Sequence, residues 1–169
     1  MGRYENFERV TRAALDYALA VVGNDLDESS RRDIVAAYDH LEAFDDVHQG
    51  LKDIRAQGHR MVVLSNGTPS MLSAVAASAA LAEYFDELIS VDDVGAYKPS
   101  ARVYAHAACR LQLPLDSIRL VSSNPFDVIG ADSAGMQVAW LNRSGGPFDP
   151  LEQAPELIAR TLTDLAERL

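Results

Sequence analysis

The chain is poor in cysteine and in basic residues, and both shortages exclude classes of protein. Cys109 is the single cysteine among 169 residues, so the sequence holds no internal disulfide and no cysteine-rich metal site. Lysine and arginine number 15 against 25 acidic residues, which gives a formal net charge of −10 with the histidines neutral. So few cations, spread along the whole chain, form no stripe that neutralises phosphates. We therefore expect no nucleic-acid partner.

Metal-ligand spacing and long apolar segments are also missing. The histidines share no spacing that is typical of a metal site: His40, His48, His59 and His106. The first residues lack the apolar core of a signal peptide, and the stretch 72–82 is too short and too rich in serine and alanine to span a bilayer. We expect no metal, no other cofactor and no membrane partner, with a cytoplasmic location by default. Cys109 has apolar helical neighbours, which favours a core thiol over a reactive one.

Helical periodicity dominates the N-terminal part. Apolar residues recur at intervals of three and four from Tyr4 to Val21, and the pattern stops at Gly23-Asn24. A second stripe follows a cap at Asp27 or Ser29, and its members are Ile34, Val35, Tyr38 and Leu41. The two segments predict a helical hairpin.

From Val47 onward, helical patterns alternate with short apolar runs. Several of the runs are apolar on both faces, which is typical of parallel strands covered by helices. The alternation predicts an α/β fold, a parallel sheet with helices on both faces. We expect strands at 61–64, 88–91, 118–121 and 137–141, and helices at 47–57, 69–80, 101–111, 125–134 and 155–169. Polar clusters after the strands meet at the carboxyl edge, where ligands bind.

The first polar cluster is Ser65-Asn66-Gly67-Thr68. On a structural interpretation, Thr68 caps a helix and Gly67 supplies a backbone angle that other residues resist. On a functional interpretation, Ser65 and Asn66 offer a hydroxyl and an amide to an anion beside a helix N-terminus. The sequence leaves both interpretations open.

Two further clusters surround Lys98 and Asp127. Lys98 precedes a helix that we expect Ser100 to cap, and the carboxyl edge would aim its ammonium group at the same cavity as Ser65. Asn124 and Asp127 resemble a capping box, with Asp in place of Glu. Asp127 is also the one carboxylate expected to face Lys98, with Ser122 and Asn124 as neutral donors beside it.

Together these clusters resemble the haloacid dehalogenase (HAD) superfamily, and within it the type II L-2-haloacid dehalogenases. The motifs that carry the resemblance are Ser65-Asn66-Gly67, Lys98-Pro99 with Tyr104 six residues after the lysine, and Ser122-Ser123-Asn124 with Asp127. The resemblance implies a HAD-like Rossmannoid fold, with a partial helical cap over 1–44 and a core over 45–169. Phosphatase members carry an acidic pair at the last motif to hold magnesium. This chain has only Asp127 there, which favours a metal-free dehalogenase.

The resemblance implies a substrate and a role for each matched residue. The substrate is a small halogenated carboxylic acid, from which a carboxylate nucleophile displaces halide to give an ester that water hydrolyses. By the resemblance, Ser65 binds the substrate carboxylate, Asn66 helps to bind the leaving halide, and Lys98 orients the nucleophile. Asp127 positions Lys98 and the hydrolytic water. Supporting hydrogen bonds are expected from Tyr104, Ser122 and Asn124, and apolar contacts with the substrate from Phe126 and Phe7.

The chain departs from the family at the nucleophile. The family's aspartate lies at the end of the first strand in the pattern Asp-x-x-Gly-Thr, whereas the resemblance begins at Tyr4, after that pattern. We therefore expect this chain to lack the first, central strand and to be inactive alone. Asp92-x-x-Gly95 follows an apolar run, but it has no threonine and makes a poor substitute.

The same departure has structural consequences. The missing strand is flanked in the family by the strands at Met61 and Ile118, so we expect two unpaired edges that aggregate or close by pairing directly or with a partner. A homodimer through the hairpin stays open, because the family's cap contributes to dimers. Two other functions stay open as well: a non-catalytic remnant that binds small carboxylates, and a magnesium-dependent HAD phosphatase.

Overall fold

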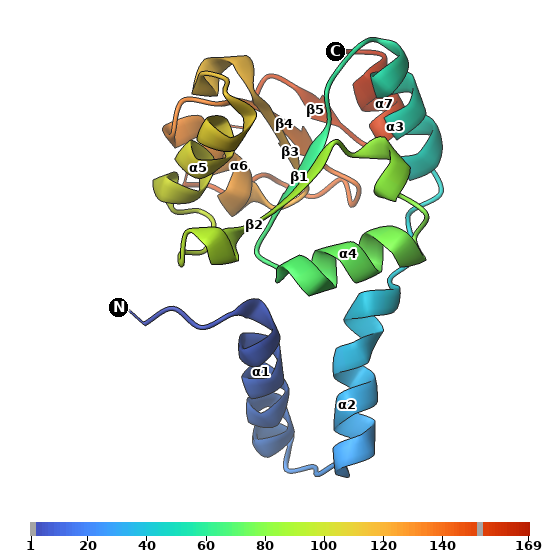
Figure 1. The fold of residues 1–169 in the computed structure, drawn as a ribbon, viewed down its shortest axis with the longest axis vertical. Coiled ribbons are helices and arrows are strands. Elements are labelled where there is room, and N and C mark those ends of the chain that lie inside the picture. The colour runs from blue at the N-terminus through green and yellow to red at the C-terminus, as the bar shows by residue number, and fades with distance from the viewer. Residues whose placement is uncertain (1–2, 152–153) are drawn as a thin grey trace. The chain divides into compact units, whose positions relative to one another are not determined.

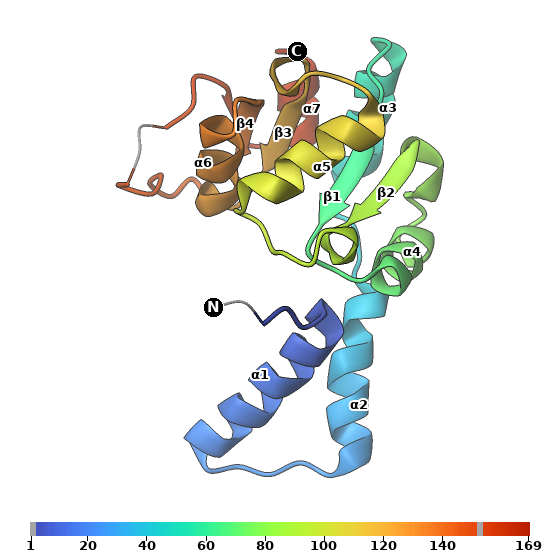
Figure 2. The same cartoon turned by 60° about the vertical axis from the view of Figure 1, so that its left-hand side comes forward.

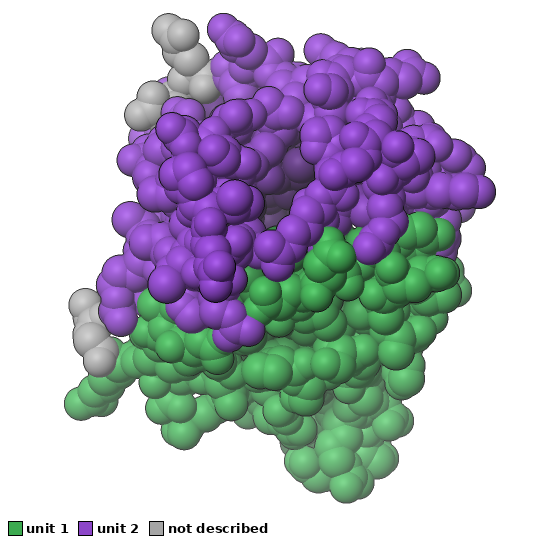
Figure 3. All heavy atoms as spheres, turned by 45° about the horizontal axis from the view of Figure 1, so that its top comes forward, with its two compact units in different colours: residues 1–42, 62–95 green, residues 43–61, 96–169 purple. Residues whose placement is uncertain are grey.

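The structure, a computed structural model, describes residues 3–151 and 154–169. The chain divides into two compact units, Met1–Glu42 with Val62–Gly95 and Ala43–Met61 with Ala96–Leu169 (Figure 3). The first is called unit 1 and the second unit 2. Each unit contains one parallel sheet and its own helices, so both are assembled from segments that are distant in sequence. The functional division into a cap over 1–44 and a core over 45–169 stays a prediction.

Unit 1 begins with the predicted helical hairpin. Helices α1 (Phe7–Val22) and α2 (Glu28–Ala36) are its two arms (Figure 2), and the 3-10 helix η1 (Ala37–His40) continues α2. The Asn6 side chain caps α1 by accepting from the Arg9 N–H, and Gly23 ends the helix at a φ of 65° that an L side chain rarely adopts. Asp27 caps α2, and its hydrogen bonds from Ser29 and Ser30 lower the pKa of the carboxyl.

The sheet of unit 1 has two parallel strands, β1 (Val62–Ser65) and β2 (Glu87–Ser90). Helix α4 (Pro69–Ser78) follows β1, and the 3-10 helices η2 (Ala82–Tyr84) and η3 (Val91–Asp93) lie on either side of β2 in sequence. As predicted, the Thr68 side chain caps α4 by accepting from the Met71 N–H, and Pro69 is the first helical residue. The β1–β2 register pairs Ser65 with Ser90, so both strands end in a serine at one edge of the sheet.

The sheet of unit 2 has three parallel strands in the order β3-β4-β5 (Figure 1). The strands are β3 (Arg119–Ser122), β4 (Gln137–Leu141) and β5 (Ile158–Ala159). The helices of this unit are α3 (Val47–Ala56), α5 (Ala101–Leu111), η4 (Leu115–Ser117), α6 (Pro125–Ser133) and α7 (Leu162–Ala166). Parallel strands alternating with helices confirm the predicted α/β class.

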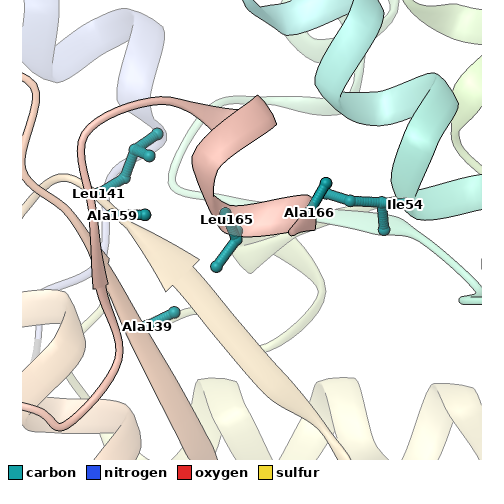
Figure 4. Close-up of a cluster of buried hydrophobic side chains, with 6 residues drawn as sticks. All are labelled: Ile54, Ala139, Leu141, Ala159, Leu165 and Ala166. Carbon is teal, nitrogen blue, oxygen red and sulfur yellow. The ribbon is translucent and has the colours of Figure 1, made fainter. Parts of the chain in front are cut away.

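A hydrophobic cluster joins the sheet of unit 2 to helices α3 and α7. Figure 4 shows its buried members: Ile54, Ala139, Leu141, Ala159, Leu165 and Ala166. Gly50 allows α3 and α7 to approach closely, because a Cβ at this position would lie 2.4 Å from Leu162 Cβ. Among the described residues, no helix combines the length and the hydrophobicity that crossing a lipid bilayer requires.

Two expectations about the architecture are wrong, and one alternative of a third is excluded. The segment 155–169 is not one helix: residues 158–159 pair with β4 as strand β5, and α7 starts only after Thr161, whose side chain accepts from the Asp164 N–H. Backbone pairing along the open edge of β4 outweighs the helical pattern there. The described strands form two sheets, with β1 and β3 in different ones, which excludes one of the alternatives, direct pairing of these two strands; aggregation or pairing with a partner stays a prediction. Cys109 is exposed, because the buried stripe of α5 runs along its other face.

Asp46 ties three parts of unit 2 together. Its carboxylate accepts two hydrogen bonds from the Arg143 guanidinium, at 2.5 and 3.0 Å, and one from the Leu162 N–H at 2.6 Å. The guanidinium also lies 4.3 Å from the centroid of the Phe44 ring. Partial burial raises the pKa of Asp46, but the hydrogen bonds from Arg143 and Leu162 outweigh it, and the net shift is downward.

Replacing Asp46 with asparagine should therefore weaken unit 2 in a pH-dependent way. A carboxylate with a lowered pKa stabilises the fold above its ordinary pKa of about 3.9, and that stabilisation disappears as the pH falls through the folded value. Asp46→Asn should lower the free energy of unfolding by roughly 1–2 kcal/mol at neutral pH, the range of a charge-assisted hydrogen bond. Urea melts from pH 7 to pH 3 should show the difference from wild type shrinking below about pH 4.

The matched control is Asp53→Asn on the same helix, where the carboxylate accepts from the neutral amide of Gln49 at 2.6 Å. This variant should stay close to wild type throughout. A constant deficit of Asp46→Asn across the whole pH range would show that the charge of Asp46 is not the source of its contribution.

Candidate active site

A buried ion pair lies at the centre of the predicted site in unit 2. The Lys98 ammonium donates to Asp127 Oδ2 at 2.7 Å, and the Tyr104 hydroxyl donates to Asp127 Oδ1 at 2.8 Å. The Asp127 side chain is 2% exposed and that of Lys98 13% exposed. Lys98 lies ahead of α5, Tyr104 within α5, and Asp127 in the first turn of α6. The motifs of Lys98 and Asp127 therefore meet as predicted, with both oxygens of the carboxylate occupied.

The environment keeps Tyr104 protonated. Burial raises the pKa of its phenol, and the hydrogen bond to Asp127 and the negative charge of that carboxylate raise it further. A phenol in this state is a permanent donor to Asp127. The pair of Lys98 and Asp127 is neutral overall, which limits the cost of burying two charges.

Close packing at Gly130 allows this geometry. A Cβ at Gly130 would lie 2.4 Å from Pro99 Cβ and 2.8 Å from the Tyr104 hydroxyl oxygen. Any side chain there would separate α6 from the segment that carries Lys98, because neither contact has room to relax. Pro99 itself follows Lys98 through a cis peptide bond.

The segment after β3 has a different local structure from the one predicted. Ser122 Oγ accepts from the Asn124 N–H at 3.1 Å, and the Asn124 side chain makes no capping hydrogen bond to α6. The capping-box interpretation is therefore wrong, because Lys98 and Tyr104 occupy the Asp127 carboxylate that would have completed it. Ser100 makes no capping hydrogen bond to α5 either. Phe126, beside Asp127, is 46% exposed.

The remaining predicted residues, Ser65, Asn66 and Phe7, belong to unit 1. Ser65 Oγ accepts from the Gly67 N–H at 3.1 Å, so its own proton remains to be donated. The Phe7 ring packs edge-to-face against Tyr38, with centroids 6.5 Å apart. Gly67 is not among the glycines with positive φ, so the expectation that it supplies a special backbone angle is wrong.

Sequence reasoning missed Ser90. This serine is 3% exposed, and its hydroxyl donates to the Gly67 carbonyl at 2.7 Å while accepting from the Asp92 N–H at 3.1 Å. The available signal was a hydroxyl inside the otherwise apolar run 88–91. In residues 3–151 and 154–169, no group of three or more His, Cys, Asp and Glu side chains gathers as a metal site would require.

Comparison with known proteins identifies the family. A family model described as haloacid dehalogenase-like hydrolase matches residues 1–135. An (S)-2-haloacid dehalogenase from Pseudomonas fluorescens is 36% identical over 169 residues, which cover 100% of this chain and 74% of the relative. The chain belongs to the L-2-haloacid dehalogenase family. The resemblance seen in the sequence motifs is thereby confirmed.

Solved structures agree with this membership of the L-2-haloacid dehalogenase family. The L-2-haloacid dehalogenase from Xanthobacter autotrophicus, with chloropropionic acid covalently bound, matches with a TM-score of 0.90 and 35% identity, covering 99% of this chain and 77% of that one. A HAD phosphatase from Thermococcus onnurineus matches with a TM-score of 0.70 and 25% identity, covering 90% and 69%. The dehalogenase is the more similar of these two.

A double-mutant comparison tests the ion pair of this dehalogenase-family site. Lys98→Met leaves the buried Asp127 carboxylate without its counter-charge and should lower the free energy of unfolding by about 3 kcal/mol. Lys98→Met combined with Asp127→Asn removes both charges, so it should lose clearly less than the single variant. Urea unfolding at pH 7 measures both values.

Lys52→Met is the control, because Lys52 is exposed on α3. It should change stability little. If the double variant were as unstable as Lys98→Met, an unpaired Asp127 charge would not explain the loss.

Proposed function

We propose that this chain is the lysine-bearing part of an enzyme that hydrolyses short L-2-haloalkanoic acids to 2-hydroxy acids. The observation that carries the proposal is the buried Lys98–Asp127 pair with its Tyr104 donor, in a chain of the L-2-haloacid dehalogenase family. The chloropropionic acid bound covalently in the Xanthobacter autotrophicus enzyme supports a reaction that passes through an ester.

The reaction has two steps. A carboxylate oxygen attacks C2 of the haloacid, a C–O bond forms as the carbon–halogen bond breaks, and halide leaves with the electron pair. Water then adds to the carbonyl carbon of the ester, and the 2-hydroxy acid leaves with the original oxygen of the nucleophile's carboxylate. One proton is released to solvent, and the carboxylate is regenerated.

The residues of this chain would bind the anionic groups and exclude water. The Ser65 hydroxyl has a proton to donate to the substrate carboxylate, and the Asn66 amide would cradle the leaving halide. Lys98 would orient the nucleophile, with Asp127 positioning its ammonium and the hydrolytic water. Supporting roles fall to Tyr104, Ser122 and Asn124 in the hydrogen-bonded network and to Phe126 and Phe7 as apolar walls.

The donor set supports chemistry without a metal. Magnesium in a HAD phosphatase needs carboxylates with oxygens to spare, but both oxygens of Asp127 bond Lys98 and Tyr104. The neighbours Ser122, Ser123 and Asn124 add neutral groups only. The proposal therefore favours dehalogenation over phosphoryl transfer.

The test supplies the nucleophile. Residues 1–169 contain no Asp-x-x-Gly-Thr pattern, so a fusion places the N-terminal segment of the Pseudomonas fluorescens relative ahead of Tyr4. The fusion should release chloride from L-2-chloropropionate and not from the D enantiomer, whereas residues 1–169 alone should release none. Lys98→Met in the fusion should lower kcat/KM by at least about 100-fold, as the loss of one preorganised charged group does.

A folded fusion that releases no chloride would contradict dehalogenation. The alternative, a non-catalytic module that binds small carboxylates, draws on the Ser65 hydroxyl. It predicts that millimolar L-lactate raises the Tm of both chains without any turnover. Magnesium-dependent release of phosphate from p-nitrophenyl phosphate would indicate the phosphatase instead.

We also propose that the hairpin, as part of the cap, pairs with a second copy of the chain. Helix α1 exposes a patch of large apolar side chains, with Tyr17 73%, Val21 66% and Val22 71% exposed. Tyr17→Lys should convert a dimer to a monomer in light scattering at micromolar concentration. Leu151→Lys, at an equally exposed apolar residue outside the hairpin, should not. A monomeric wild type would contradict the pairing.

A further inference from the structure

A chain of hydrogen bonds in unit 1 connects the start of the hairpin with Ser65. The Tyr4 hydroxyl donates to the Asp92 carboxylate, and the Asp92 N–H donates to Ser90 Oγ at 3.1 Å. Ser90 Oγ donates to the Gly67 carbonyl at 2.7 Å, and the Gly67 N–H donates to Ser65 Oγ at 3.1 Å. Consecutive hydrogen bonds share a residue, so the series is continuous from Tyr4 to Ser65.

Gly67 accepts a hydrogen bond from the last residue of β2 and donates one to the last residue of β1. Ser65 ends β1 and Ser90 ends β2, and the two are register partners. Ser65 binds the N–H of Gly67 and Ser90 binds its carbonyl, so both polar groups of this buried peptide segment are held by serine hydroxyls. A buried carbonyl without its donor costs free energy, so the Ser90 hydroxyl stabilises this shape of the loop.

The glycine itself does not determine the loop shape. Gly67 has no positive φ, and a Cβ there would meet Ser65 Oγ at 3.5 Å and Leu72 Cδ2 at 3.6 Å, which are ordinary contacts. Neither torsional freedom nor a steric limit at Gly67 therefore fixes where Ser65 points. The hydrogen bonds of the Ser65 and Ser90 hydroxyls with Gly67 are the contacts that orient the Ser65 side chain.

The outer end of this series of hydrogen bonds lies at Tyr4 and Asp92. Asp92 accepts from Tyr4, and Gly95, at a φ of 62°, has the Tyr4 ring 3.9 Å from the position of a Cβ. Lys98 follows Gly95 by three residues. Within unit 1, Ser90 thus contacts both Gly67, in the loop after Ser65, and the N–H of Asp92.

We propose that Ser90 is a positioning residue for the binding of the substrate carboxylate. Its hydroxyl fixes Gly67, and Gly67 in turn directs the Ser65 hydroxyl so that its proton faces the anion. The role of Ser65 toward substrate rests on the proposed function, but the clamp on Gly67 does not. Ser90 touches no reacting atom in this role, and it acts only through Gly67 and Ser65.

The test compares variants of the 169-residue chain in two measurements. Hydrogen exchange of the Gly67 amide, followed by NMR without ligand, reports the clamp. Titration with L-2-chloropropionate reports binding. Ser90→Ala should speed exchange at Gly67 and raise Kd at least about 5-fold, the effect of one hydrogen bond, while Ser90→Thr, which keeps the hydroxyl, should stay near wild type.

The matched control is Ser73→Ala on α4, where the hydroxyl donates to the Pro69 carbonyl one turn earlier in the same helix. It should change neither measurement. A lower Tm for Ser90→Ala with unchanged Gly67 exchange and unchanged Kd, measured well below the melting temperature, would overturn the proposal, because a merely stabilising serine behaves in that way.

The outcomes separate this inference from the proposed function. If residues 1–169 bind no L-2-chloropropionate, the Gly67 exchange rate alone decides the clamp: faster exchange in Ser90→Ala supports it, and an unchanged rate overturns it. Chloride release by the fusion tests the proposed function separately. If wild type binds and Ser65→Ala abolishes binding, a Kd for Ser90→Ala within 2-fold of wild type overturns the positioning role.

Discussion

The buried carboxylate of Asp127 is the constraint on which the site in unit 2 depends. A charge that is 2% exposed is tolerated only when a counter-charge and hydrogen bonds surround it, and Lys98 and Tyr104 supply both. That requirement extends to the backbone, because α6 must approach Pro99 closely enough for the pair to form. Gly130 is the residue that permits the approach. The lysine is thus held by packing over several elements rather than by its own flexible side chain.

Unit 1 also buries polar groups, but here the hydrogen-bond partners are neutral. The loop after β1 buries the Gly67 peptide groups, and hydroxyls from the two neighbouring strands satisfy them. Parallel pairing with Ser65 opposite Ser90 makes this possible, since both side chains leave the sheet at the same edge. A hydroxyl that accepts from the backbone keeps its proton for a ligand. Strand register therefore brings both serine hydroxyls to Gly67.

The features that the sequence predicted correctly depend on residues close together in the chain. The side chains of Asp27 and Thr68 cap helices where the sequence predicted caps, and apolar runs predicted strands β1 to β4 to within one residue. Tertiary contacts decided the rest. Residues 158–159 became a strand because β4 had an open edge, and the predicted capping box failed because Lys98 and Tyr104 engage the carboxylate of Asp127. Ser90 escaped notice because its partner, Gly67, lies 23 residues away and only the register reveals it.

The net charge of −10 repels an anion, but this repulsion is weak at a buried site. Exposed charges are screened beyond about 8 Å at physiological salt, so most of the acidic residues contribute little at a binding site. Buried donors are screened much less. In the proposed reaction, the Lys98 ammonium group, held by Asp127, orients the nucleophile, and the Ser65 hydroxyl donates to the substrate carboxylate. Local donors, rather than the field of the whole chain, then determine whether the anion binds.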